Sequence, residues 1–150
     1  MVHTSNSLEE TEKLAEIFVD FIKQHPSFNA YGFSGDLGSG KTAFTKCVAK
    51  ILGTTEHVTS PTFVLQKKYL IPSVDFPFNI LVHIDSYRLN SGREHEAIGF
   101  KNELEVSDNL IFIEWPEKVE DTLPNNIPIL KFTFIDDYTR TVEFPAIMEE

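Results

Sequence analysis

The chain has 150 residues, a length that favours one domain spanning 1–150, and 41% of the residues are hydrophobic. Its formal net charge of −10 argues against a protein that grips nucleic acid alone, because phosphate contacts require lysine and arginine. The sequence has no run of about 18 apolar residues, its polar and acidic start is unlike a signal or transit peptide, and Cys47 has no second cysteine to pair with. These features favour a cytoplasmic protein without a membrane segment.

The first predicted element is an amphipathic helix over residues 8–24. Ser7 and Glu10 have the spacing of a capping box, which marks a helix start. The apolar residues that recur behind it at helical spacing are Leu14, Ile17, Phe18, Phe21 and Ile22. Pro26 marks the end of this helix.

Residues 35–42 read GDLGSGKT, which has the spacing of a phosphate-binding P-loop. A predicted strand over 29–34 precedes the loop and a predicted helix over 41–52 follows it, which is the context that a P-loop requires. Its glycines let backbone N–H groups approach phosphate oxygens, and the helix N-terminus faces the same anion. The residues predicted to bind nucleotide here are Gly35, Asp36, Leu37, Gly38, Ser39, Gly40, Lys41 and Thr42.

Two roles within this motif are specific. Lys41 provides the charge that faces the β- and γ-phosphates, and the Thr42 hydroxyl is a ligand for Mg²⁺. Magnesium needs further hard oxygen ligands, and the usual source is an acid at the end of a buried strand.

Two predicted apolar strands, over 79–85 and 109–114, end in such acids, Asp85 and Glu114. Asp85 follows the commoner pattern for a metal acid. Glu114 either ligates the metal, directly or through water, or orients or deprotonates the attacking water. A loop-capping role for either acid is the other interpretation. His83, inside the first strand, is interpreted as a structural residue.

The remaining segments carry weaker signals. Ser60-Pro61-Thr62 is either a switch loop, in which Thr62 senses the γ-phosphate, or a plain turn. Trp115 is either a packing residue or a platform beside nucleotide. Arg88 and Arg93 are each either a contact to the γ-phosphate or part of an ion pair. The last predicted elements are a strand over 63–70, a helix over 92–99 and a C-terminal β-hairpin over 127–135 and 139–144.

Four motifs in order, GDLGSGKT, SPTF at 60–63, HIDSYRL at 83–89 and IEWPE at 113–117, closely resemble the TsaE family of bacterial P-loop ATPases. The resemblance implies an α/β, P-loop NTPase-like three-layer fold with a mainly parallel central sheet. It implies ATP and Mg²⁺ as ligands, slow hydrolysis, and nucleotide-handling roles for Asp85, Glu114 and Trp115.

The same resemblance implies partners. Members of this family work with TsaD and TsaB subunits in a complex that transfers threonylcarbamoyl to adenosine 37 of tRNAs reading ANN codons, so tRNA is met only through the complex. The alternatives are a small-molecule kinase, for which the chain is short, and a nucleotide-dependent binding module without significant hydrolysis. A GTPase switch lacks support, because the guanine-reading Asn-Lys-x-Asp stretch does not occur.

Overall fold

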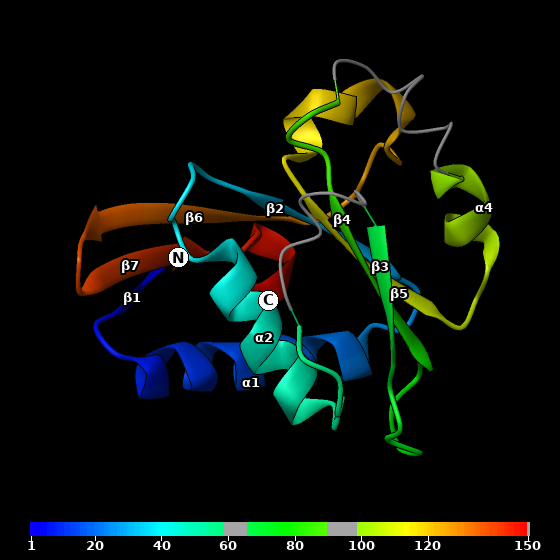
Figure 1. Cartoon of the computed structure of the whole chain (residues 1–150), viewed down its shortest axis with the longest axis horizontal. Helices are drawn as coiled ribbons and strands as arrows, with labels where there is room; N and C mark the ends of the chain where they lie inside the picture. The colour runs from blue at the N-terminus through cyan, green and yellow to red at the C-terminus, as the bar shows by residue number, and fades with distance from the viewer. Residues whose placement is uncertain (59–65, 90–98, 150) are drawn as a thin grey trace.

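The computed structural model describes residues 1–58, 66–89 and 99–149 (Figure 1). In chain order the elements are β1 (Val2–Ser5), α1 (Leu8–Gln24), β2 (Ala30–Ser34), α2 (Lys41–Ile51), β3 (Gln66–Leu70), β4 (Ile80–Asp85), α4 (Phe100–Glu105), β5 (Asn109–Glu114), the 3-10 helix η1 (Pro116–Thr122), β6 (Ile129–Asp136), β7 (Thr139–Glu143) and the 3-10 helix η2 (Ala146–Glu149). None of the helices in the described ranges has the length and apolar character needed to cross a bilayer.

The strands form one sheet of seven, in the order β1-β7-β6-β2-β5-β4-β3. Its centre is parallel, because β2 pairs in parallel with β5 and β6, and β5 pairs in parallel with β4. Both margins are antiparallel, through β3 with β4 on one side and through β6, β7 and β1 on the other. The expectation of a mainly parallel central sheet is confirmed for its centre, and the margins add antiparallel strands. The predicted C-terminal hairpin is confirmed as β6 and β7.

Alternating side chains of the sheet build two cores, one on each face. Tyr31 and Phe33 of β2 pack into a cluster with α1 and α2, which cross next to each other in Figure 1. On the opposite face Val82 of β4 packs with Phe100 of α4 and Val119 of η1. Helical elements thus cover both faces of the sheet, as the predicted three-layer arrangement requires.

Helix α1 begins and ends where the sequence predicts. The backbone N–H of Glu10 donates to Ser7 Oγ at 3.2 Å, and the Glu10 carboxylate accepts from the backbone N–H of Asn6 rather than of Ser7. One apolar position departs from the prediction, because Ile17 is 49% exposed.

Other elements differ from the sequence predictions. Strand β1 and helix η1 were not expected, and a helix lies at Phe100–Glu105, directly after the range predicted for one. The predicted helix over 92–99 and the first residues of the predicted strand over 63–70 fall mostly outside the described residues. Strand β1 owes its conformation to antiparallel pairing with β7, which its own four residues do not signal.

The packing of Phe18 gives a test of the larger core. Its ring lies 5.0 to 6.0 Å, between centroids, from the rings of Tyr31, Phe33, Phe44 and Phe112. Phe18→Ala is expected to lower the free energy of unfolding in urea by about 3–5 kcal/mol, because it leaves a cavity in that cluster. Ile17→Ala on the same helix is the control and should cost less than about 1 kcal/mol. Equal losses would contradict this packing.

Candidate functional site

The glycine loop, defined here as residues 35–40, joins β2 to the start of α2. Gly40 is the N-cap of α2 with a φ of 104°, a conformation that favours glycine, and it offers no side chain to cap the helix. Gly35 has a φ of 151°, and a Cβ there would collide with the carbonyl oxygen of Phe132. The first turn of α2 therefore presents uncapped N–H groups and the positive end of a helix dipole at this loop.

Lys41 is the first residue of α2, and its side chain turns back over the glycine loop. The residue is 5% exposed. Its Nζ donates to the carbonyl oxygen of Gly35 and lies 3.9 Å from the centroid of the Trp115 ring. Burial lowers the pKa of its ammonium group below the ordinary value, and the nearby carboxylates of Glu114, Glu117, Asp85 and Asp36 oppose this shift.

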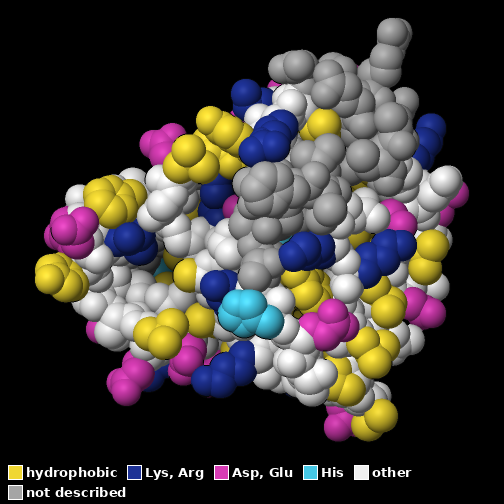
Figure 2. All heavy atoms as spheres, viewed as in Figure 1, with side chains coloured by type: hydrophobic (Ala, Val, Ile, Leu, Met, Phe, Trp, Pro, Cys, Tyr) yellow, Lys and Arg dark blue, Asp and Glu magenta, His cyan; other side chains and the backbone are white. Residues whose placement is uncertain are grey.

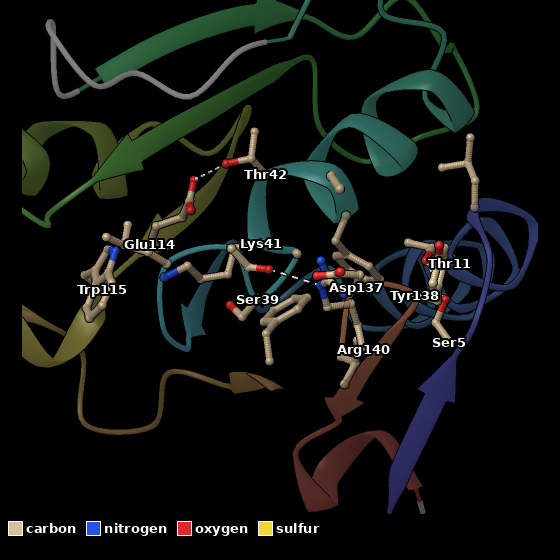
Figure 3. Close-up of a pocket in the computed structure, with 18 of the residues that line it drawn as sticks. Ser5, Thr11, Ser39, Lys41, Thr42, Glu114, Trp115, Asp137, Tyr138 and Arg140 are labelled. Atoms are coloured by element: carbon tan, nitrogen blue, oxygen red, sulfur yellow. Dashed lines mark hydrogen bonds between the residues drawn. The ribbon is translucent and has the colours of Figure 1, made fainter. Parts of the chain in front are cut away.

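The two strand-end acids lie side by side. The parallel pairing of β4 with β5 places Asp85 opposite Glu114, and both carboxylates are largely buried. Glu114 Oε2 accepts a hydrogen bond from Thr42 Oγ1 at 3.4 Å (Figure 3). Asp85 Oδ1 accepts from the backbone N–H of Tyr87 at 3.0 Å and so also holds the turn after β4.

Glu114 has a second, shorter contact. His83 Nε2 lies 2.5 Å from Glu114 Oε2, and both side chains are buried. The histidine comes from the strand beside Glu114 and lies on the same face of the sheet as Asp85, two residues further on. His83, which was interpreted as structural, is thus a buried residue whose ring contacts the carboxylate of Glu114.

These groups surround a cavity of about 820 Å³. One end is lined by Thr42, Asp85, Glu114 and Trp115, as the left side of Figure 3 shows for the labelled residues. The other end lies between the start of α1 and the tip of the β6–β7 hairpin, where the lining residues include Asn6, Thr11, Asp137 and Tyr138. The cavity is thus an elongated space with acids and a buried ammonium at one end and mixed polar and aromatic groups at the other.

Trp115 belongs to this cavity rather than to either core cluster. It is half-buried, its ring centroid lies 5.0 Å from that of Tyr87, and Lys41 contacts its face. Its φ of 59° makes it the one non-glycine residue with positive φ in the described ranges. Such backbone strain costs about 1–3 kcal/mol and concentrates at functional sites.

Most of the predicted site residues come together. The cavity lining includes Leu37, Gly38, Ser39, Gly40, Lys41, Thr42, Asp85, Glu114 and Trp115. Gly35 and Asp36, at the start of the loop, are not among its lining residues. Thr62, which was predicted as a switch residue, and Arg93 lie outside the described residues.

Sequence reasoning missed the contribution of the hairpin. Arg140 Nε donates to the carbonyl oxygen of Gly38 at 3.0 Å, across 102 positions of sequence, and its guanidinium lies 4.4 Å from the centroid of the Phe134 ring. Nothing near Arg140 in the sequence signals this contact. For His83 a signal existed, since alternation along a strand places residues 83 and 85 on one face.

The donors around Thr42 allow a fit test for a divalent cation. Among the described residues, no group of three or more His, Cys, Asp and Glu is arranged to hold a metal ion. A hydroxyl and a carboxylate do meet, however, at Thr42 and Glu114. Adjacent oxygens of an octahedral Mg²⁺ site lie about 3.0 Å apart, given a metal–oxygen distance of about 2.1 Å. The observed separation of 3.4 Å is larger than that spacing, but both groups are hard oxygen donors of the kind that Mg²⁺ prefers, so the chemistry of the pair fits the ion.

The fold and the site define a class: α/β proteins with a parallel central sheet, in which a glycine-rich loop opens a helix beside strand-end carboxylates. The family model described as threonylcarbamoyl adenosine biosynthesis protein TsaE matches residues 5–142, and the chain belongs to this family.

Individual relatives agree with this assignment. The tRNA threonylcarbamoyladenosine biosynthesis protein TsaE of Rickettsia typhi is 34% identical over 140 residues, which are 93% of this chain and 90% of the relative. The protein of the same name from Bacillus subtilis is 32% identical over 142 residues, covering 93% of this chain and 81% of the relative. The crystal structure of Bacillus subtilis YdiB superimposes with a TM-score of 0.67 at 26% identity, covering 96% of this chain and 83% of that one.

The link between Arg140 and the glycine loop is testable without any ligand. Arg140→Ala is expected to speed amide hydrogen exchange at residues 38–40, because the loop loses the hydrogen bond that ties Gly38 to β7. Lys131→Ala, an exposed change on the neighbouring strand β6, is the control and should leave that exchange unchanged. Exchange that is the same in the Arg140 variant and the wild type would show that the hairpin does not hold the loop.

Proposed function

We propose that the glycine loop is a P-loop and that the chain is a magnesium-dependent ATPase with slow turnover. The observation that carries this proposal is the placement of Lys41 and the start of α2 next to Glu114, with the Thr42 hydroxyl on the carboxylate. A buried ammonium, uncapped helix N–H groups and a hydroxyl–carboxylate pair are what a magnesium–polyphosphate requires in one place.

The cavity suits a nucleotide in size and in polarity. Its volume of about 820 Å³ falls within the range of roughly 300–1,000 Å³ usual for small-ligand pockets. The phosphates would lie over residues 38–42. The ribose and base would then extend toward Asn6, Thr11 and Tyr138, where the lining offers hydrogen-bonding groups and an aromatic ring.

Thr42 and Glu114 are the residues that would hold Mg²⁺. The Thr42 hydroxyl donates its hydrogen to Glu114, which leaves its oxygen lone pairs for the cation. When bound, the ion neutralises charge on the β- and γ-phosphates. Asp85 pairs with Glu114 in the register and lines the same cavity. It would therefore act on the attacking water.

The reaction would be transfer of the γ-phosphoryl group to water. The water oxygen forms a bond to the γ-phosphorus, the bond to the β–γ bridging oxygen breaks, and ADP and inorganic phosphate leave. Lys41 would exchange its contact with the Gly35 carbonyl for the phosphate oxygens, and Asp85 would orient the water or take its proton. A binding module without significant hydrolysis would use the same loop and differ only in this last step.

Membership of the TsaE family supports a role for the proposed activity in the synthesis of threonylcarbamoyladenosine in tRNA. We propose that the chain works as the accessory subunit of a complex with TsaD-type and TsaB-type proteins, which modifies adenosine 37 of tRNAs reading ANN codons. The net charge of −10 supports tRNA contact through those partners. On the face drawn in Figure 2, Lys and Arg side chains are scattered among acidic and apolar ones instead of forming one basic surface.

The deciding experiment is ATP turnover by the purified chain, alone and with the two partner subunits. Slow release of phosphate that rises with the partners supports the proposal. Tight ATP binding without release in either case would establish the binding module instead. Phosphate transfer to a small acceptor would establish a kinase.

The first variant to test is Lys41→Ala. It removes the charge that would face the phosphates, so ATP affinity should fall more than tenfold, as followed by the fluorescence of Trp115. Lys46→Ala is the matched control, because Lys46 is exposed on the same helix and does not line the cavity. If both variants bind ATP like the wild type, the loop is not a phosphate site.

The second test separates the two acids. Glu114→Gln should raise the Mg²⁺ concentration needed for half-maximal turnover, because it replaces the charged carboxylate beside Thr42 with a neutral amide. Asp85→Asn should leave that concentration unchanged and lower kcat by roughly 10²–10⁴-fold, the usual effect of losing acid–base help. Turnover measured across a Mg²⁺ series checks both variants. The reversed pattern would assign the metal to Asp85.

A further inference from the structure

His83 is a buried imidazole with one polar contact. The residue is 0% exposed, and its Nε2 lies 2.5 Å from Glu114 Oε2. Its other ring nitrogen, Nδ1, is buried and has no hydrogen-bond partner in the part of the chain that the structure describes. A carboxylate oxygen accepts hydrogen bonds, so Nε2 is the donor in this contact.

Packing alone does not account for this arrangement. A buried polar atom without a partner is unfavourable, and the apolar neighbours Val82 and Ile84 show that aliphatic residues occupy the same strand. The contact also supplies the shorter of the two hydrogen bonds on Glu114, 2.5 Å against 3.4 Å from Thr42. The main interaction of the imidazole is therefore its hydrogen bond to the Glu114 carboxylate, not apolar packing.

We propose that His83 is a positioning residue, which holds Oε2 of Glu114 and so aims the carboxylate at the Thr42 hydroxyl and at a divalent cation bound there. This inference rests on the proposed function. Glutamate has a long, flexible side chain, and in a buried site without a donor it has no fixed orientation. Hydrogen-bonded partners behind metal-binding carboxylates orient them, and their loss typically weakens metal affinity or activity by about 10–100-fold.

Three substitutions of His83 separate positioning from packing. His83→Leu removes the hydrogen-bond donor and fills the buried position with an apolar side chain. His83→Gln keeps an N–H donor at the distance of Nε2, whereas the shorter His83→Asn places its N–H nearer the position of Nδ1. A positioning role predicts that Gln restores function and that Asn and Leu do not. A packing role predicts that the functional loss of each of the three variants is proportional to its loss of thermal stability.

The measurement is a Mg²⁺ titration of the Trp115 fluorescence response to a non-hydrolysable ATP analogue, a readout that does not depend on turnover. His83→Leu and His83→Asn should raise the half-saturating Mg²⁺ concentration by about 10–100-fold. His83→Gln should recover most of that loss. In turnover assays at saturating Mg²⁺ the KM for ATP should change little, since Lys41 and the loop remain intact.

A double-mutant cycle closes the test. In a Glu114→Gln background, His83→Leu should cause almost no further increase in the Mg²⁺ requirement, because the carboxylate that His83 would position is already gone. Additive shifts, or equal effects of Gln and Leu at position 83, would overturn the proposal while leaving the ATP site in place. A wild-type chain that shows no response to the analogue with Mg²⁺ would overturn the proposed function, and the positioning role with it.

Discussion

The candidate site depends on the parallel alignment of β4, β5 and β2. Parallel strands bring their carboxyl ends to one edge of the sheet, so the residues that end these strands must meet there. The register sets Asp85 opposite Glu114, and Phe33 of β2 opposite Glu114 on the other side. The glycine loop leaves β2 one residue later. A shift of either pairing by one residue would turn an acid to the opposite face of the sheet.

The same alignment concentrates charge in a buried place. Lys41 is 5% exposed and Glu114 is 4% exposed, and burial of an ionised group is unfavourable unless partners offset it. Here the offsets are local: the Gly35 carbonyl and the Trp115 ring for the ammonium, and His83 and Thr42 for the carboxylate. These buried polar groups lower the stability of the free protein. A bound ligand and a bound cation would replace their present partners.

The sequence predicts best where local patterns and the fold agree. The bounds of α1 follow from its capping box and apolar spacing, and GDLGSGKT predicts a glycine loop that opens a helix. The acids at residues 85 and 114 were placed correctly at strand ends, because short apolar runs ending in an acid are visible without tertiary information.

The failures have tertiary causes. Strand β1 forms through its pairing with β7, and Arg140 contacts Gly38 across 102 positions of sequence. Neither contact can be predicted from the neighbouring residues in the chain. Ile17 has helical spacing but is half exposed, and spacing alone does not tell which apolar positions of a helix the rest of the fold covers. The contact of His83 with Glu114 was not predicted, because its partner on the next strand becomes apparent only from the register.

The proposal that an acidic chain binds a polyanion presents an apparent conflict, and distance resolves it. The formal charge of −10 is spread over the whole chain, and at physiological ionic strength charges farther apart than about 8 Å are largely screened. At the glycine loop the groups that a phosphate would meet are within hydrogen-bonding reach: uncapped N–H groups of α2 and the Lys41 ammonium. Screening is weak in a buried site, so these few local donors outweigh the distant carboxylates. Asp85 and Glu114 line this end of the cavity and would repel phosphate, and a divalent cation between them and the phosphates would remove that repulsion.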